Sequence, residues 1–355
     1  MGTFNTVTHF KHFYLTPLLF IFIACLLSSC ASTPKKYETG YFGLFDTYTN
    51  LVVYAKSESE FRRCADGIRD RLLELHRYFD IYESYDGVNN LKTVNDMAGV
   101  APVPVCGEIV ELLKFSKMMY TETNGAFNIA LGPVLSIWHT YREAGVQHPE
   151  TAVPPPMEIL IEASAHTDIE KLIIDEEHMT VFLSEPGMSI DVGAAAKGYA
   201  AQLIAEQLTD GVSVLMDIGG NVVTVGNPPG KYGFWNVGVF NPDHGQDGAD
   251  ELLTTLKTGS AAVVTSGDYQ RYYEADGVRY GHIIDPDTLA PAARYRSVTV
   301  VHENSGLADV LSTALFILPF EDGFALAERF GAAVLWMTRD GEIYRNGRFE
   351  QYENR

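Results

Sequence analysis

The sequence predicts an α+β fold in which helices pack on largely antiparallel sheets. Short stretches rich in β-branched and apolar residues outnumber the stretches with helical spacing. Many of these strand-like stretches follow one another directly instead of alternating with helices, as they would in a doubly wound α/β fold. No internal repeat, low-complexity tract or clear linker interrupts residues 41–355, so we expect a single folded unit there.

The first half of this unit combines a short strand with two helices. Residues 51–54 form a β-prone run, and residues 58–79 have apolar side chains at helical spacing. A second helix is predicted over 107–121, and Asn124-Gly125 ends it because such residues favour the left-handed conformation at a helix end. The triple proline 154–156 marks a loop and the start of a short helix. The runs 172–174 and 180–183 then predict a hairpin.

The second half is richer in strands. A helix is predicted from Lys197 to about Leu208, where Ala200, Leu203 and Ile204 share one face. Asp276-Gly277 and Asp340-Gly341 are typical hairpin turns. The predicted strands are 212–217, 235–240, 261–264, 297–301 and 333–337, and two more helices cover 307–318 and 321–330.

Residues 1–29 are typical of a bacterial lipoprotein signal peptide. Lys11 lies in a weakly basic start, and the apolar run 14–27 is too short for a comfortable membrane span. The run ends in Leu27-Ser28-Ser29-Cys30, which resembles a lipobox, whose cysteine is lipidated and becomes the mature N-terminus. We therefore expect a lipid on Cys30, a tether over 30–40, and anchoring to the bacterial inner membrane with the folded unit facing the periplasm or the extracytoplasmic side.

Composition excludes some partners. A net charge of −20 disfavours binding of nucleic acid or an anionic membrane through a basic patch, so no nucleic-acid partner is expected. Cys64 and Cys106 remain beyond the signal; export permits a disulfide, and two buried free thiols are an equal alternative. No CxxC or HExxH pattern indicates a zinc site.

Residues 189–200 concentrate unusual chemistry. Ser189 and Ile190 lead into Asp191, small residues follow, and Lys197 opens the helical pattern. A strand, an acidic residue, a glycine turn and a helix start together expose backbone N–H and C=O groups to a ligand. Asp191 as an ordinary helix cap is the alternative.

Asp309 and Thr313 are one turn apart at the start of the helix 307–318, so their oxygens lie on one face. With a backbone carbonyl from a glycine-rich turn they would form a hard-oxygen site suited to Mg²⁺. Asn128 and Asp217 likewise stand beside small residues. For Asp309 alone, a role in capping the helix is the alternative.

Eight segments, taken in order from about residue 43 to 338, resemble the FAD:protein FMN transferase (ApbE-type) family. They are Phe45-Asp46-Thr47, Ser84-Tyr85, 125–128 with Gly132-Pro133 and Trp138, 190–200, 219–221, 265–269, 282–286 and 308–314. The resemblance implies a T-fold-related single catalytic unit. The implied reaction passes FMN from FAD to a Ser/Thr hydroxyl of an acceptor flavoprotein in a membrane redox complex and releases AMP.

The resemblance also implies roles for individual residues. The expected FAD contacts are Phe45, Tyr85, Ala126, Phe127, Asn128, Asp191, Lys197 and Ile283, with Ser312 near the phosphates. The Ala194 carbonyl, Asp309 and Thr313 would hold Mg²⁺. His282 would accept the proton of the acceptor hydroxyl, as an imidazole that titrates near working pH, and Asp285 is the next base to consider.

This sequence departs from the family pattern at four positions. Phe45-Asp46 replaces Met-Gly, Asn128 replaces Asp, Leu289 replaces a glycine, and Lys197 stands where some members carry Glu. Two other functions fit the same residues. One is a Mg²⁺-dependent FAD pyrophosphatase that uses water and yields FMN and AMP, and the other is a lipid-anchored flavin-binding protein without chemistry.

Overall fold

The computed structural model describes residues 1–2, 33–208, 211–231, 233–245 and 249–353. Residues from Lys35 to Arg355 form one compact unit. It begins earlier than the expected position 41, because residues from Lys35 onward form a sheet strand and the predicted tether therefore ends sooner. Cys30 and nearly all of the predicted signal peptide lie outside the described residues.

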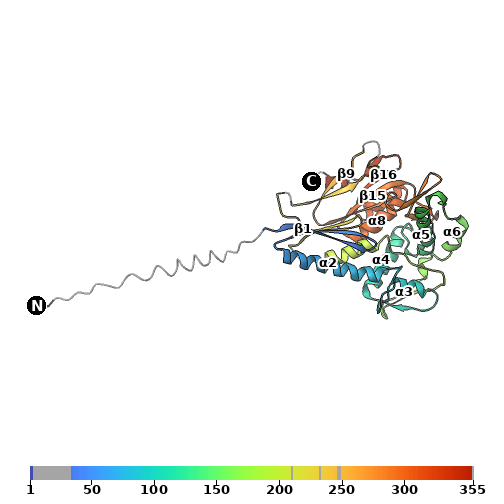
Figure 1. Ribbon diagram of the computed structural model, residues 1–355, viewed down its shortest axis with the longest axis horizontal. Coiled ribbons are helices and arrows are strands. Elements are labelled where there is room, and N and C mark those ends of the chain that lie inside the picture. Colours follow the sequence, from blue (N-terminus) through green and yellow to red (C-terminus); the bar gives the residue numbers. More distant parts are fainter. Residues whose placement is uncertain (3–32, 209–210, 232, 246–248, 354–355) are drawn as a thin grey trace. The chain divides into compact units, whose positions relative to one another are not determined.

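Among the described residues, eight strands form one fully antiparallel sheet, which confirms the predicted class (Figure 1). Their order in space is β1-β2-β6-β7-β10-β15-β16-β17. Their bounds are β1 (Lys35–Leu44), β2 (Thr47–Ala55), β6 (Ser213–Ile218), β7 (Asn221–Val225), β10 (Ala261–Gly267), β15 (Tyr295–His302), β16 (Ala333–Thr338) and β17 (Ile343–Arg345).

Helices cover one face of this sheet. They are α2 (Glu58–Phe79), α7 (Ala196–Gln207), α8 (Ser305–Ile317) and α9 (Phe320–Arg329). The Ser57 side chain caps α2 by accepting from Glu60 N, and the α2 residues Ile68, Leu72 and Leu75 bury the predicted stripe. The helix α8 packs on α7, β10 and β15. Residues of α7 and β10 therefore lie next to residues of α8.

A hairpin and a short helix cover the opposite face. β8 (Trp235–Phe240) pairs with β9 (Leu252–Thr258), and α10 (Gly347–Glu353) packs beside them. Trp235, Leu256 and Phe349 bury this second core against Val263 and Leu335 of the sheet. The sequence did not predict α10.

A third cluster packs at the end of the molecule where Figure 1 shows α5 and α6 side by side. It joins α5 (Gly132–Gln147) and α6 (Met157–Ser164) to β11 (Tyr272–Ala275), β12 (Val278–Gly281), β13 (Ile284–Asp285) and β14 (Ala290–Pro291). The core of the cluster contains Val134, Trp138 and Tyr273. The sequence did not predict α5, because its buried positions are few and Gly132-Pro133 reads as a loop.

The remaining segments connect these layers. They are α3 (Leu91–Asp96), α4 (Gly107–Glu122), the 3₁₀ turns Ile129–Leu131, Pro149–Thr151 and Ile169–Lys171, and the sheet of β3 (Val103–Pro104), β5 (Thr180–Leu183) and β4 (Leu172–Asp175). Cys64 and Cys106 are free and half-buried, and burial raises the pKa of both thiols. None of the helices in the described ranges has the length and apolar character to cross a membrane.

Candidate functional site

The turn before α7 is held in shape by a backbone bond to Ile129 and by two side-chain hydrogen bonds. Asp191 N donates to the Ile129 carbonyl (2.8 Å), and Asp191 Oδ1 accepts from Gly193 N (2.8 Å). Lys197 Nζ donates to the Gly193 carbonyl (3.1 Å), and the half-buried Ala194 follows in the same turn. Burial raises the pKa of the Asp191 carboxyl. The predicted acidic residue, turn and helix start are therefore present, whereas the predicted strand at Ser189-Ile190 is wrong, because residues 188–192 are irregular.

Asp309 binds the start of α7. Its Oδ2 accepts from Gly198 N (2.8 Å), and the residue is only 5% exposed. A Cβ on Gly198 would lie 2.4 Å from both Asp309 Cβ and the Ser305 carbonyl oxygen. Only glycine allows α7 and α8 to approach this closely.

Three hydroxyls on α8 and β10 are linked to one another and to the Asp309 backbone. Ser312 Oγ donates to the Asp309 carbonyl (2.8 Å). Ser266, on β10, places its Oγ 2.8 Å from Ser312 Oγ and 3.4 Å from Thr313 Oγ1. We call Asp309, Ser312, Thr313 and Ser266 the carboxylate cluster.

The carboxylate cluster has the chemistry of a Mg²⁺ site. Carboxylate and hydroxyl oxygens are hard ligands, and Mg²⁺ commonly takes only one or two carboxylates from the protein. No group of three or more His, Cys, Asp or Glu side chains arranged for a metal occurs in the described ranges. The predicted ligands Asp309 and Thr313 thus lie on one face of α8, as the spacing predicted.

His282 lies in a buried, positively charged setting. Its Nδ1 is buried and has no hydrogen-bond partner among the described residues. Burial, and then the charges of Arg271, Arg142 and Lys197, lower the pKa of His282 to about 3. The expectation that this imidazole titrates near working pH is therefore wrong for the ligand-free protein, in which the ring is neutral at pH 7.

Arg142 and Arg271 are the residues that sequence reasoning missed. Arg142, on α5, lies 2.7 Å through Nη2 from Nδ1 of His139, and burial followed by the charge of Arg271 lowers its pKa. Arg271 is exposed just before β11. We call Arg142, Lys197 and Arg271 the cationic cluster.

Tyr82 joins the same region. Its ring lies 5.7 Å from the His139 ring, and burial followed by the charge of Asp191 raises its pKa to about 12. The predicted Tyr85 is held by other partners: its hydroxyl donates to Asp80 Oδ2 (2.6 Å) and lies 3.4 Å from His76 Nε2. His76 Nδ1 accepts from Phe45 N (3.3 Å), so Phe45 and Tyr85 share one histidine.

Phe45 and Asp46 form the two-residue turn between β1 and β2, with φ values of +52° and +53°. Both central residues of a type I′ turn have positive φ, and glycine is preferred at the second. The family's Met-Gly would satisfy that preference, and Phe-Asp does so less well.

The segment 126–128 reaches the site through its backbone. Ala126 and Phe127 are buried. The Asn128 side chain accepts from Ala130 N (2.9 Å) and donates to the Thr167 carbonyl (3.0 Å). Asn128 therefore caps a 3₁₀ turn whose first residue, Ile129, accepts from Asp191 N.

The segment after His282 is a rigid turn. Ile283 is buried, and Asp285 Oδ1 accepts from Asp287 N (2.9 Å). Leu289, in place of the family glycine, has φ +59° and donates its N–H to the Asp285 carbonyl (2.8 Å). Trp138 Nε1 donates to the Leu289 carbonyl (2.8 Å), which fixes this turn on α5.

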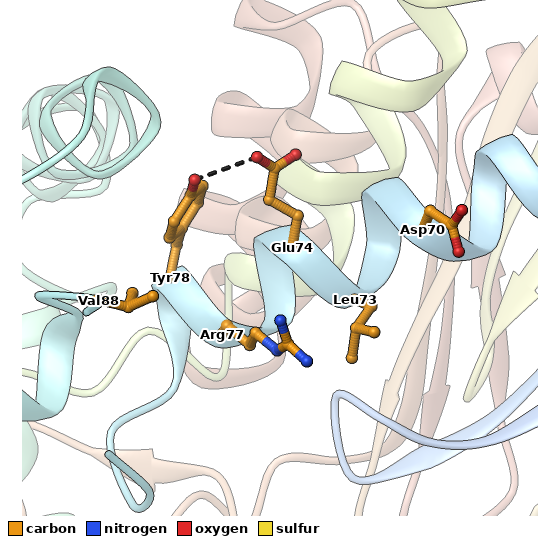
Figure 2. Close-up of a pocket in the computed structure, with 6 residues that line it drawn as sticks. All are labelled: Asp70, Leu73, Glu74, Arg77, Tyr78 and Val88. Carbon is orange, nitrogen blue, oxygen red and sulfur yellow. Dashed lines mark hydrogen bonds between the residues drawn. The ribbon is translucent and has the colours of Figure 1, made fainter. Parts of the chain in front are cut away.

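An open pocket of about 290 Å³ lies along α2. Figure 2 shows it lined by Asp70, Leu73, Glu74, Arg77, Tyr78 and Val88, with Tyr78 donating to Glu74 Oε1 (3.1 Å). None of the predicted site residues lines it. Within its lining Tyr78 and Glu74 bond to each other, whereas Asp70 pairs with Arg69 outside it.

Known proteins match this chain over nearly its whole folded unit. The ApbE family profile matches residues 45–336. The FAD:protein FMN transferase of Treponema pallidum is 33% identical over 346 residues, 90% of each chain, and that of Klebsiella pneumoniae is 32% identical over 78% of this chain and 84% of its own. The crystal structure of the ApbE protein from Thermotoga maritima superposes with a TM-score of 0.79 and 31% identity, covering 90% of this chain and 100% of that one. From this match in sequence and fold, and from the site it contains, the chain belongs to the ApbE family.

Proposed function

We propose that this protein transfers FMN from FAD to a Ser or Thr hydroxyl of an acceptor flavoprotein, with release of AMP and dependence on Mg²⁺. The family and its curated relatives make the chain a flavin transferase. The metal, the leaving group and the acceptor hydroxyl belong to the proposal.

One observation carries it: consecutive residues of α7 join the two clusters. Lys197 contributes its charge around His282, and Gly198 N binds Asp309. A pyrophosphate needs charge neutralisation from more than one side when its bridging bond breaks. Cations on one side and hard oxygen ligands on the other meet that requirement.

The chain's own groups then have distinct tasks. Arg142, Lys197 and Arg271 bind the phosphates, and Asp191, with the turn 191–195, orients the flavin end. His282 accepts the proton of the attacking hydroxyl through a ring nitrogen. Its low pKa reflects burial first and then the nearby cations, and an anionic pyrophosphate beside those cations would offset their part and raise the pKa. The hydroxyl oxygen bonds to the FMN phosphorus, and the bond to the AMP oxygen breaks.

Asp309, Thr313 and the Ala194 carbonyl would hold Mg²⁺. The ion, when bound, polarises the pyrophosphate oxygens and stabilises the charge that develops on them. Phe45, Tyr85, Ala126, Phe127, Asn128 and Ile283 remain our proposed flavin contacts. Ser312 is fully buried and donates its one hydroxyl hydrogen to the Asp309 carbonyl, so it would lie near the phosphates without donating to them. Tyr82 joins this proposal because it lies beside Asp191 and His139.

The test uses the full chain in detergent with FAD, Mg²⁺ and an acceptor flavoprotein. We expect covalent flavin on the acceptor, AMP in equal amount, and no transfer to an acceptor whose target Ser or Thr is alanine. Free FMN and AMP with either acceptor would instead identify a pyrophosphatase. FAD binding without AMP release would identify a flavin-binding protein.

We also propose that Cys30 carries a lipid that anchors the protein to the inner membrane. The lipobox-like Leu27–Cys30 after a short apolar run supports this. Cys30→Ala should remove the protein from the detergent phase in a Triton X-114 partition of whole cells. Persistence of the variant in that phase at the wild-type level would contradict the lipid anchor.

A further inference from the structure

We propose that Ser266 is a positioning residue for the metal site, because it accepts a hydrogen bond from the Thr313 hydroxyl and leaves the Thr313 oxygen lone pairs free for the cation. This inference rests on the Mg²⁺ site proposed above. Ser266 comes from β10, whereas both side-chain ligands come from α8.

The argument starts from the count of hydroxyl protons. A serine or threonine hydroxyl has one hydrogen to donate and two lone pairs to accept with. Ser312 Oγ donates to the Asp309 carbonyl at 2.8 Å, which uses its only hydrogen. The contact of 2.8 Å between Ser266 and Ser312 must therefore be donated by Ser266.

That assignment fixes the next hydrogen bond. Since Ser266 has used its hydrogen on Ser312, it can only accept in its contact of 3.4 Å with Thr313 Oγ1. Thr313 consequently donates, and its oxygen keeps both lone pairs. The usual competitor for a helical Thr hydroxyl is the carbonyl four residues earlier, Asp309 O, which already accepts from Ser312.

The chain of donors runs in one direction, from Thr313 to Ser266 to Ser312 to the Asp309 carbonyl. It ends on the residue whose carboxylate is the charged ligand. Ser312 is fully buried, which holds the chain in place. A relay of this kind restricts the Thr313 rotamer and aims its lone pairs away from the sheet, as partners behind a metal ligand commonly do.

The neighbouring residue provides a matched control. Thr265 precedes Ser266 on β10, and adjacent strand residues point to opposite faces. Its hydroxyl lies 2.9 Å from Thr299 Oγ1 on β15. Thr265→Val therefore removes a hydroxyl of similar burial that has no link to Thr313.

The experiment measures Mn²⁺ affinity of the full chain by electron paramagnetic resonance in the absence of FAD, so it needs no turnover. Ser266→Ala should weaken binding about 10-fold, in the range typical for loss of a partner behind a ligand. Thr265→Val should bind as wild type does, and Ser266→Thr, which keeps the hydroxyl, should bind within about twofold of wild type. In a Thr313→Val background Ser266→Ala should cause no further loss, since its effect passes through Thr313.

The outcomes separate two failures. If wild type binds Mn²⁺ and Ser266→Ala binds equally well, the positioning role is wrong and the metal site stands. If wild type and Asp309→Asn bind Mn²⁺ equally weakly, the metal site itself is wrong, and the role of Ser266 falls with it. A further loss on adding Ser266→Ala to Thr313→Val would also overturn the inference, because the serine would then act by another route. Should Ser266→Ala melt below wild type without metal, Ser266→Thr decides: weak binding by a stable variant contradicts the role, and wild-type binding supports it.

Discussion

The two clusters that Lys197 and Gly198 join are built on opposite principles. In the carboxylate cluster, Asp309, Ser312 and Ser266 have hydrogen-bond partners, and the fold alone sets their geometry. In the cationic cluster, three positive charges surround a histidine whose Nδ1 is buried and unpaired within the described chain. The first arrangement is stable by itself, and the second is unfavourable until an anion arrives. On the function proposed above, the Mg²⁺ site would therefore be preformed, and an anionic substrate would supply the negative charge that the cationic cluster lacks.

The largest expected effect follows from a substitution that removes the negative charge of the carboxylate cluster and keeps its geometry. Asp309→Asn keeps an oxygen that can accept from Gly198 N and loses the negative charge. We expect transfer to fall at least about 10³-fold, because a bound cation contributes several kcal/mol of charge stabilisation. The melting temperature of the metal-free protein should stay close to that of wild type.

Covalent flavin on the acceptor is the readout, and Asp322→Asn, in the first turn of α9, is the control that loses a charge outside the site. Full turnover of wild type in excess EDTA would show that no divalent cation is needed. The carboxylate cluster would then not be a metal site.

The second effect tests His282, the histidine beside the cationic cluster. His282→Gln should lower transfer by about 10²–10⁴, the usual contribution of a positioned base, with FAD affinity within a few-fold of wild type. The exposed His148 serves as the control position, as His148→Gln. A variant that transfers normally would move the base to another group, Asp285 first, and one that cannot bind FAD would make His282 a structural residue.

The third effect concerns stability and pH in the ligand-free protein. The folded pKa of His282, about 3, lies below the value of about 6.5 for an unfolded histidine. The unfolded chain therefore binds an extra proton between these values, and the free energy of unfolding falls as the pH drops from 6.5 toward 3. At pH 5 the loss is 1.5 pH units at about 1.36 kcal/mol each, or about 2 kcal/mol.

Urea denaturation at pH 7.5 and pH 5 measures this loss. His282→Gln should lose about 2 kcal/mol less than wild type between the two values. The buried Asp191 and Asp217 carboxyls have raised pKa values and act with the opposite sign, and both variants retain them. An equal loss in the two proteins would show that burial and the nearby cations do not lower the pKa of His282 in the folded protein.

The carboxylate cluster could largely be predicted from the sequence, because its parts are local. Asp309 and Thr313 are one helical turn apart, and the apolar pattern of the helix 307–318 predicts which face they share. Ser266 belongs to the segment 265–269, which can be identified from the sequence. Its contact with Thr313 could not be predicted, because the packing of β10 on α8 is a tertiary contact.

The cationic cluster could not be predicted, because nothing local connects Arg142 with Arg271. Arg142 lies on α5, a helix with few buried positions, and Arg271 precedes a short strand of another layer. Leu289 is an intermediate case: a glycine in the family at this position indicates a positive φ, and the structure has φ +59° there. What remained hidden was the bond from Trp138 that holds this turn on α5.

The smallest expected effect concerns the turn that carries Phe45. The molecule contains a second two-residue hairpin turn with positive φ at both positions, Asp276 (+50°) and Gly277 (+74°) between β11 and β12. Asp-Gly suits this turn type, whereas Phe45-Asp46 places two side chains in the left-handed region, which costs each ordinary residue about 1 kcal/mol. Asp46→Gly should therefore raise the free energy of unfolding by about 0.5–1 kcal/mol, and Gly277→Asp should lower it by a similar amount. Because Phe45 and the turn type are unchanged in Asp46→Gly, FAD affinity should stay within about twofold of wild type.

Urea denaturation measures the free energy of unfolding, and fluorescence titration with FAD measures the affinity. If Asp46→Gly gains stability and loses FAD affinity several-fold, the strain at this turn positions Phe45 for the flavin. The flavin side of the site would then be preorganised, unlike the cationic cluster.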